Sequence, residues 1–306
     1  MEATRTPHSS RPDLVDPAAI AALGHIEIVA RWIVEGFMNG LHRSPRKGFS
    51  VEFAEYRPYQ TGDDLRFLDW KILARADRWV IKQYEEETNL RATIVLDVSR
   101  SMAWAGAPER LTKLAYAERL AAALALLLLR QRDAVGLVRF DDAVRSVVPP
   151  RSREGQWRRI VGALEEPGAG LASSAPAGLA QAARLVDRRG MVVLVSDLLM
   201  DVAGVQESVR ALRAAGHNVV VLHVMDPAER DFTLGGEAMF RDPESGLEVP
   251  AAAADVRGAY RETVEEVIGE WRSAFAGLGA TYAVVTTDSP FAVPLRQAFA
   301  ARERLP

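Results

Sequence analysis

Oxygen-bearing side chains follow an apolar run in the stretch IVLDVSRSM, which spans residues 94–102. Asp97, Ser99 and Ser101 stand at every second position, so a chain leaving a strand can turn all three side chains toward one point. A carboxylate and two hydroxyls are hard oxygen ligands, which suit Mg²⁺, Mn²⁺ or Ca²⁺ and suit zinc or copper poorly. Asp and Ser are also ordinary turn residues, so the motif alone indicates a metal only weakly.

Two later segments offer further oxygen ligands. The stretch VLVSDLL places Asp197 at the end of another apolar run, and ASSA offers Ser173 and Ser174 just before a predicted helix. We predict that all three segments meet at one edge of a sheet and hold a hard divalent cation there. The alternative is that these residues cap turns and helices, a role that is compatible with metal binding for Asp197.

The elements that must position these residues belong to an α/β domain predicted over residues 91–306. ATIVLDV, MVVLVSDLL and HNVVVLHVMD are apolar throughout and alternate with helices, one of them a long helix with Pro108 near its start. This alternation is typical of a doubly wound, mostly parallel sheet with helices on both faces. In such a sheet, ligands bind beyond the carboxyl ends of the strands.

The sequence before residue 91 lacks the alternation of apolar strands and helices predicted for the rest of the chain. Residues 1–12 are polar and are predicted to form a disordered tail. Residues 13–90 are predicted to form a smaller, mixed α/β extension, which begins with a helix and continues with strands in SVEFAEY and RWVIKQY.

Composition excludes several classes of protein. Of 306 residues, 48% are hydrophobic and 26% are charged, which is typical of a globular protein. A net charge of -3 argues against a nucleic-acid binder with a basic face. The absence of cysteine excludes disulfides and thiolate metal sites and favours a cytoplasmic protein. The most apolar run, residues 120–129, is about half the roughly 20 residues of a spanning helix, so we expect no membrane insertion.

The oxygen ligands resemble the metal-ion-dependent adhesion site (MIDAS) of von Willebrand factor A domains. In those domains Asp-x-Ser-x-Ser is followed by a threonine from a second loop and an aspartate from a third. Asp97, Ser99, Ser101 and Asp197 match this pattern. The threonine is missing, and Ser173 is the expected replacement, with Ser174 as its competitor.

Residues 50–90, which include GDDLRFLDW, resemble the signature of the domain-of-unknown-function 58 family. Its bacterial and archaeal members carry a von Willebrand A-like domain after this block, and the resemblance covers about residues 20 to 290. Members are often encoded beside AAA+ ATPases of the MoxR type. The resemblance therefore implies a partner or adaptor of such an ATPase in the assembly or activation of client proteins.

The resemblance also implies a non-catalytic mode of action. The side chains supply fewer ligands than the six that Mg²⁺ takes, so a carboxylate from a partner protein can complete the shell. Arg100, Met102 and Ser174 are expected on the rim, where the partner would touch them, although plain solvent exposure is the alternative for Arg100 and Met102.

Two other functions stay open. A metal-dependent hydrolase or phosphatase would also place an aspartate at the end of the first strand. Position 99 is a serine where a phosphotransferase would need a second aspartate, and the sequence holds no GxSxG, Walker A or strand-linked GxGxxG motif. The second alternative is a purely structural A-type domain whose metal site is empty.

Overall fold

The structure is a computed structural model. It describes residues 25–42, 56–60, 68, 70–76, 78–82, 90–167, 175–232, 237–241 and 248–302. Its strands are β1 (Tyr56–Pro58), β2 (Val80–Lys82), β3 (Arg91–Asp97), β4 (Ala134–Phe140), β5 (Val144–Arg151), β6 (Met191–Ser196), β7 (Asn218–Met225), β8 (Glu237–Arg241), β9 (Glu248–Ala252) and β10 (Thr281–Thr286). Its helices are α2 (Ile26–His42), α3 (Trp70–Ala76), the 3₁₀ helix η2 (Arg100–Ala103), α4 (Lys113–Arg130), α5 (Gln156–Leu164), α6 (Ala175–Leu185), α7 (Val202–Ala214), α8 (Pro227–Asp231), α9 (Ala253–Gly277) and α10 (Ala292–Arg302).

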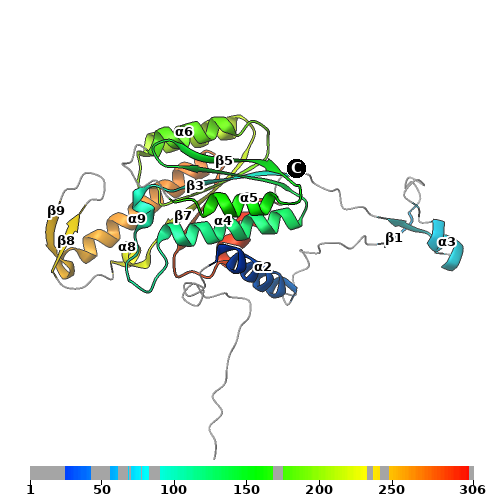
Figure 1. Cartoon of the computed structure of the whole chain (residues 1–306), viewed down its shortest axis with the longest axis horizontal. Coiled ribbons are helices and arrows are strands. Elements are labelled where there is room, and N and C mark those ends of the chain that lie inside the picture. Colours follow the sequence, from blue (N-terminus) through cyan, green and yellow to red (C-terminus); the bar gives the residue numbers. More distant parts are fainter. Residues whose placement is uncertain are drawn as a thin grey trace, which may run out of the picture.

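Six strands form one sheet in the order β10-β7-β6-β3-β4-β5 (Figure 1). Neighbouring strands run parallel, except that β5 pairs antiparallel with β4. From β3 the chain first builds outward through β4 and β5, and then returns to build the other half from β6. The strand order therefore reverses between β3 and β6, which is where doubly wound sheets bind ligands. The predicted fold class is confirmed.

Helices cover both faces of this sheet, because its central strands β3, β6 and β7 are buried on both sides. Side chains alternate along β3, so Ile94 and Leu96 pack on one face and Val95 on the other. The first face is covered by α2, α4, α5 and α10, and the second by α6, α7 and α9 (Figure 1).

Helix α2 belongs to this core, although it lies within the predicted N-terminal extension. Val29, Ile33 and Phe37 are buried in the same cluster as α4, and Phe37 lies 6.0 Å from Phe299 of α10 between ring centroids. The extension is thus not separate from the α/β domain at this helix. Farther along, β1 and β2 form an antiparallel pair, in which β2 lies where RWVIKQY predicted a strand.

Helix α4 begins later than its sequence suggests. Thr112, rather than a residue next to Pro108, is its N-cap, and the Thr112 hydroxyl accepts a hydrogen bond from the Ala115 amide at 3.0 Å. This start makes Lys113 the first residue of the helix. Among the helices of the described residues, none combines the length and the apolar character that crossing a membrane requires.

Candidate metal site at the sheet edge

The pairing of β3 with β6 brings two distant parts of the sequence together. Leu96 lies opposite Val195 in this parallel pair, so Asp97 and Ser196 follow side by side at the carboxyl end of the two strands. The Ser196 hydroxyl donates a hydrogen bond of 2.6 Å to Oδ2 of Asp97. Asp197 comes next, at the same edge.

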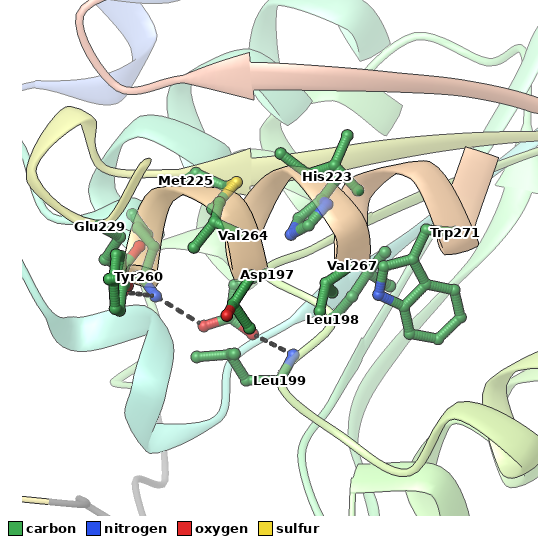
Figure 2. A pocket seen from close by; sticks show the side chains of 13 residues that line it. Asp197, Leu198, Leu199, His223, Met225, Glu229, Tyr260, Val264, Val267 and Trp271 are labelled. Carbon is green, nitrogen blue, oxygen red and sulfur yellow. Dashed lines mark hydrogen bonds and ion pairs between the residues drawn. The ribbon is translucent and has the colours of Figure 1, made fainter. Parts of the chain in front are cut away.

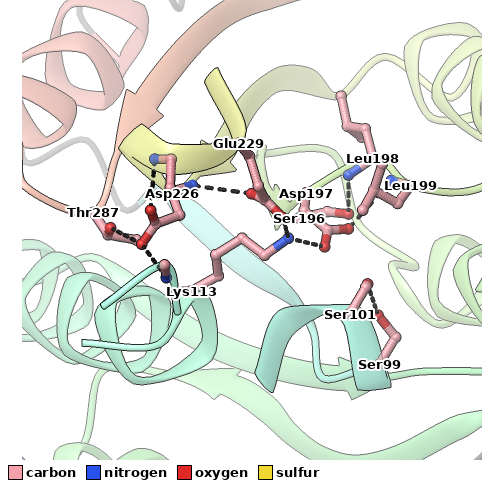
Figure 3. Close-up of polar contacts among 12 residues, drawn as sticks. Ser99, Ser101, Lys113, Ser196, Asp197, Leu198, Leu199, Asp226, Glu229 and Thr287 are labelled. Atoms are coloured by element: carbon pink, nitrogen blue, oxygen red, sulfur yellow. Dashed lines mark hydrogen bonds and ion pairs between the residues drawn. The ribbon is translucent and has the colours of Figure 1, made fainter. Parts of the chain in front are cut away.

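The two serines of the motif lie beside Asp97. The Ser99 amide donates to Oδ1 of Asp97 at 2.9 Å. The hydroxyl oxygens of Ser99 and Ser101 lie 3.1 Å apart (Figure 3). Both serines are buried, because the 3₁₀ helix η2 turns the chain back over the end of the sheet. Three hydroxyl or carboxylate side chains therefore converge within five residues.

A buried lysine stands on the other side of Asp197. Lys113 Nζ donates to Oδ2 of Asp197 at 2.8 Å and to Oε1 of Glu229 at 2.6 Å (Figure 3). Lys113 is 0% exposed, so its charge is neutralised by these carboxylates rather than by water. The lysine thereby joins the start of α4 to the end of β6 and to α8.

Burial and neighbouring charges shift the pKa values of Asp97 and Lys113. Burial, and then the nearby Asp197 carboxylate, raise the pKa of Asp97 to about 7, against hydrogen bonds from Ser196 and Ser99 that lower it. Burial lowers the pKa of Lys113, but Asp197 and Glu229 outweigh it, so the net shift of this pKa is upward. Asp97 and Lys113 therefore hold their protons more tightly than they would in water.

The charges and donor atoms fit a hard divalent cation. When Asp97 is deprotonated, Asp97, Asp197 and Glu229 carry three formal negative charges against one positive charge on Lys113, which leaves -2. The donors near Asp97 are carboxylate and hydroxyl oxygens, which Mg²⁺ and Ca²⁺ prefer. Within the described ranges, no group of three or more His, Cys, Asp or Glu side chains is placed to hold a metal, so a site here depends on the serine hydroxyls.

Neighbouring contacts fix the loop that carries these groups. Asp226, at the end of β7, accepts from the Gly106 amide at 3.1 Å and from Arg110 Nη1 at 2.7 Å. It also accepts from the Thr287 hydroxyl at 3.2 Å and forms a capping box with Glu229. Asp226 thus ties the loop before α4 to the same edge of the sheet.

The structure brings Asp97, Ser99, Ser101 and Asp197 to one edge, as the sequence predicted. Ser173 and Ser174 lie outside the described residues. Of the predicted rim residues, Arg100 is exposed, whereas Met102 is 0% exposed and belongs to the hydrophobic core. The prediction that Met102 lies on the rim is wrong, because η2 turns its side chain inward.

Sequence reasoning missed Lys113 and Glu229. A lysine at the first position of a helix opposes the helix dipole, which is a signal that its charge has partners elsewhere. Glu229 stands three residues after Asp226 in DPAE, the spacing of a capping box at the end of an apolar run. Both signals were present, but neither identifies Lys113 as the shared partner of Asp197 and Glu229.

The sheet edge around the buried polar groups carries exposed apolar side chains. Leu199, two residues after Asp197, is 55% exposed, and Trp104, directly after η2, is 36% exposed. Trp104 also lies near the lysine, with Lys113 Nζ 6.0 Å from the ring centroid. Aromatic side chains are enriched at protein–protein interfaces, which makes the exposed Trp104 a candidate contact residue.

Comparison with known proteins gives one family match. The model of the family described as "Protein of unknown function DUF58" matches residues 55–267. An uncharacterized protein of Mycobacterium tuberculosis is 28% identical over 307 residues, which cover 97% of this chain and 94% of that relative.

Solved structures also resemble the chain. The conserved hypothetical protein BatB from Bacteroides thetaiotaomicron has a TM-score of 0.45 and 17% identity, covering 69% of this chain and 98% of BatB. The SpRpn10 VWA domain has a TM-score of 0.38 and 12% identity, covering 68% of this chain and 94% of that domain.

Proposed function

The chain belongs to the family of proteins of unknown function DUF58, and from this premise we propose that it is a non-catalytic, divalent-metal-dependent protein-interaction module. The binding face is the edge of the sheet where β3 and β6 end. Asp97, Ser99, Ser101 and Asp197 would hold the cation, with Ser173 as the proposed further ligand. Mg²⁺ is the expected cation, and Mn²⁺ or Ca²⁺ suits the same oxygen donors.

The observation that carries this proposal is the convergence of Asp97, Ser99 and Ser101 beside Asp197 at the point where the strand order reverses. When bound, the cation supplies a coordination position for a carboxylate of another protein. Neighbouring residues of the chain hold the proposed ligand side chains in position. Ser196 and the Ser99 amide fix the Asp97 carboxylate.

The surroundings support protein binding rather than chemistry on a small substrate. Leu199 and Trp104 are exposed beside the polar centre, and Arg100 projects from η2 at the same edge. Aromatic and arginine side chains are enriched in the energetically important centres of protein interfaces. These three residues would surround the metal-bound carboxylate of the partner.

The partner that we propose is an AAA+ ATPase of the MoxR type or one of its client proteins. This part of the proposal rests on the family resemblance and not on a contact within the chain. An ATPase of this type would be bound through an exposed Asp or Glu, so capture should need both the cation and the intact site.

The direct test is a titration of the purified chain with Mg²⁺ and Mn²⁺, followed by capture of a purified MoxR-type ATPase with and without EDTA. Asp97→Asn and Ser99→Ala should abolish or weaken both cation binding and capture. Ser208→Ala is the matched control for Ser99→Ala, because both serines are 4% exposed. The Ser208 hydroxyl donates to the Gly204 carbonyl within α7, away from the candidate metal site. If EDTA and Asp97→Asn both leave capture of the ATPase unchanged, the metal-dependent mechanism is refuted. Phosphatase activity that depends on Asp97 would favour an enzyme instead.

A further inference from the structure

An apolar pocket opens beside the candidate metal site. It has a volume of about 210 Å³ and lies between α9 and the carboxyl ends of β6 and β7 (Figure 2). Its walls are mostly apolar, and include Leu198, Met225, Val264, Val267, Ile268 and Trp271. Asp197 lines this pocket as well as the site that holds Asp97, so the two are adjacent.

Several polar groups in the pocket are already paired within the chain. Lys113 donates to Asp197 and Glu229, and Nδ1 of His223 lies 2.7 Å from the Tyr282 hydroxyl. An apolar group can therefore cover these side chains without breaking a hydrogen bond between them, whereas a charged ligand would have to compete with existing pairs. The chemistry of the pocket selects an apolar occupant.

The volume of the pocket limits the size of the group that can occupy it. A protein cavity of roughly 150 Å³ with apolar walls is large enough to bind benzene. A pocket of about 210 Å³ thus has room for one phenyl ring or one branched aliphatic side chain. It is too small for a folded element such as a helix.

We propose that this pocket receives a large apolar side chain, such as Phe, Leu or Met, from the same partner segment that supplies the carboxylate to the metal site. The inference rests on the proposed function, because it takes the carboxylate-bearing partner as given. Two features support it: Asp197 borders both sites, and Leu199, 55% exposed, extends the apolar surface from the pocket to the sheet edge. The recognised segment is then an acidic residue with an apolar residue a few positions away.

The experiment uses capped hexapeptides that contain one Asp and one variable residue, Gly, Leu or Phe, placed one to four positions from the Asp. Binding to the full chain is measured by fluorescence anisotropy in Mg²⁺ and in EDTA. In Mg²⁺, the best Leu or Phe peptide should bind roughly tenfold to a hundredfold more tightly than its Gly counterpart, because it buries one large apolar side chain.

Variants that fill the pocket provide the control. Val267→Trp, at 40% exposed, should remove the advantage of Leu and Phe while the Gly peptide keeps its Mg²⁺ dependence. Val293→Trp changes a residue of matched exposure, 42%, on α10 away from the pocket, and should keep the full advantage. Val264→Phe fills the pocket from one turn earlier in α9 and serves if Val267→Trp does not fold.

The outcomes separate this inference from the proposed function. Gly, Leu and Phe peptides that bind equally, but only with Mg²⁺, would overturn the pocket's role and leave the metal-dependent module intact. A Phe peptide that binds more tightly than the Gly peptide, and equally well in Mg²⁺ and in EDTA, would support the pocket and refute the metal. Occupation of the pocket by toluene, seen in NMR shifts of its methyl groups, without any preference among peptides would assign it to a free apolar molecule and overturn the inference. If no peptide binds, both proposals are contradicted.

Discussion

Lys113 and Asp197 form a buried ion pair at 2.8 Å, although 84 residues separate them in the sequence. Their side chains are 1% and 2% exposed. The pair places a permanent positive charge next to one of the proposed metal ligands. Asp197 therefore stands between the ammonium on one side and the Asp97 carboxylate on the other, so the charge of Lys113 bears on the stability of the fold and on cation binding alike.

Replacing Lys113 should be costly. Lys113→Met leaves Asp197 and Glu229 without their counter-charge in a buried site, and we expect a loss of about 3–5 kcal/mol in the free energy of unfolding. Urea denaturation in EDTA measures this loss. Arg130→Met is the control, because Arg130 is exposed in the last turn of the same helix and should cost little.

The same variant should respond more strongly to Mg²⁺. Without the ammonium, a divalent cation is the available counter-charge for Asp197, so Mg²⁺ should restore part of the lost stability and bind more tightly than to the unaltered chain. If Lys113→Met and the unaltered chain have the same free energy of unfolding in EDTA, the Lys113–Asp197 ion pair does not stabilise the fold.

Asp97 should make stability depend on pH. Burial and Asp197 raise its pKa in the folded chain to about 7, from 3.8. Between these values the folded chain keeps a proton that the unfolded chain loses, so the contribution of Asp97 to the free energy of unfolding falls as pH rises from about 4 to about 7. It is fully present below pH 4.

The measurement is a series of urea denaturation curves in EDTA at pH 4 to 8, for the unaltered chain and for Asp97→Asn. Glu118, whose pKa burial also raises to about 7, is present in both proteins, so the difference between the two curves isolates Asp97. As pH rises from 4 to 7, the free energy of unfolding of the unaltered chain should fall relative to that of Asp97→Asn. A difference that stays constant across this range would mean that Asp97 is not perturbed.

Gly106 should tolerate no side chain. A Cβ added there would lie 2.4 Å from Ala228 Cβ and 2.5 Å from Oδ1 of Asp226, so the loop before α4 would have to move away from α8. We expect Gly106→Ala to lower the free energy of unfolding by about 1–3 kcal/mol. It should also weaken Mg²⁺ binding, because this loop leads into Lys113.

Gly162→Ala is the matched control for Gly106→Ala. Nothing lies within 4 Å of a Cβ at Gly162, which is exposed in α5. Alanine is the better helix former, so we expect a gain of about 0.5–1 kcal/mol. Equal effects of the two substitutions in thermal and urea unfolding would show that the loop before α4 accommodates a methyl group.

Much of the site followed from the sequence because its signals are local. The apolar run before Asp97 predicts a strand, and the similar run before Asp197 predicts another, so parallel pairing puts both carboxylates at one edge. The rim was predicted less well. Met102 was placed there by its neighbours in the sequence, but alternation along a strand no longer holds once the chain enters η2, and the side chain turns into the core.

By itself, the sequence determined the α/β class and the oxygen ligands at the ends of β3 and β6, since hydrophobic periodicity and residue type are properties of short segments. Only the tertiary structure decided that Lys113 is buried between Asp197 and Glu229, and that an apolar pocket adjoins them. A lysine at the start of a helix normally points to water. Its burial depends on carboxylates 84 and 116 residues away, which no local pattern can pair with it.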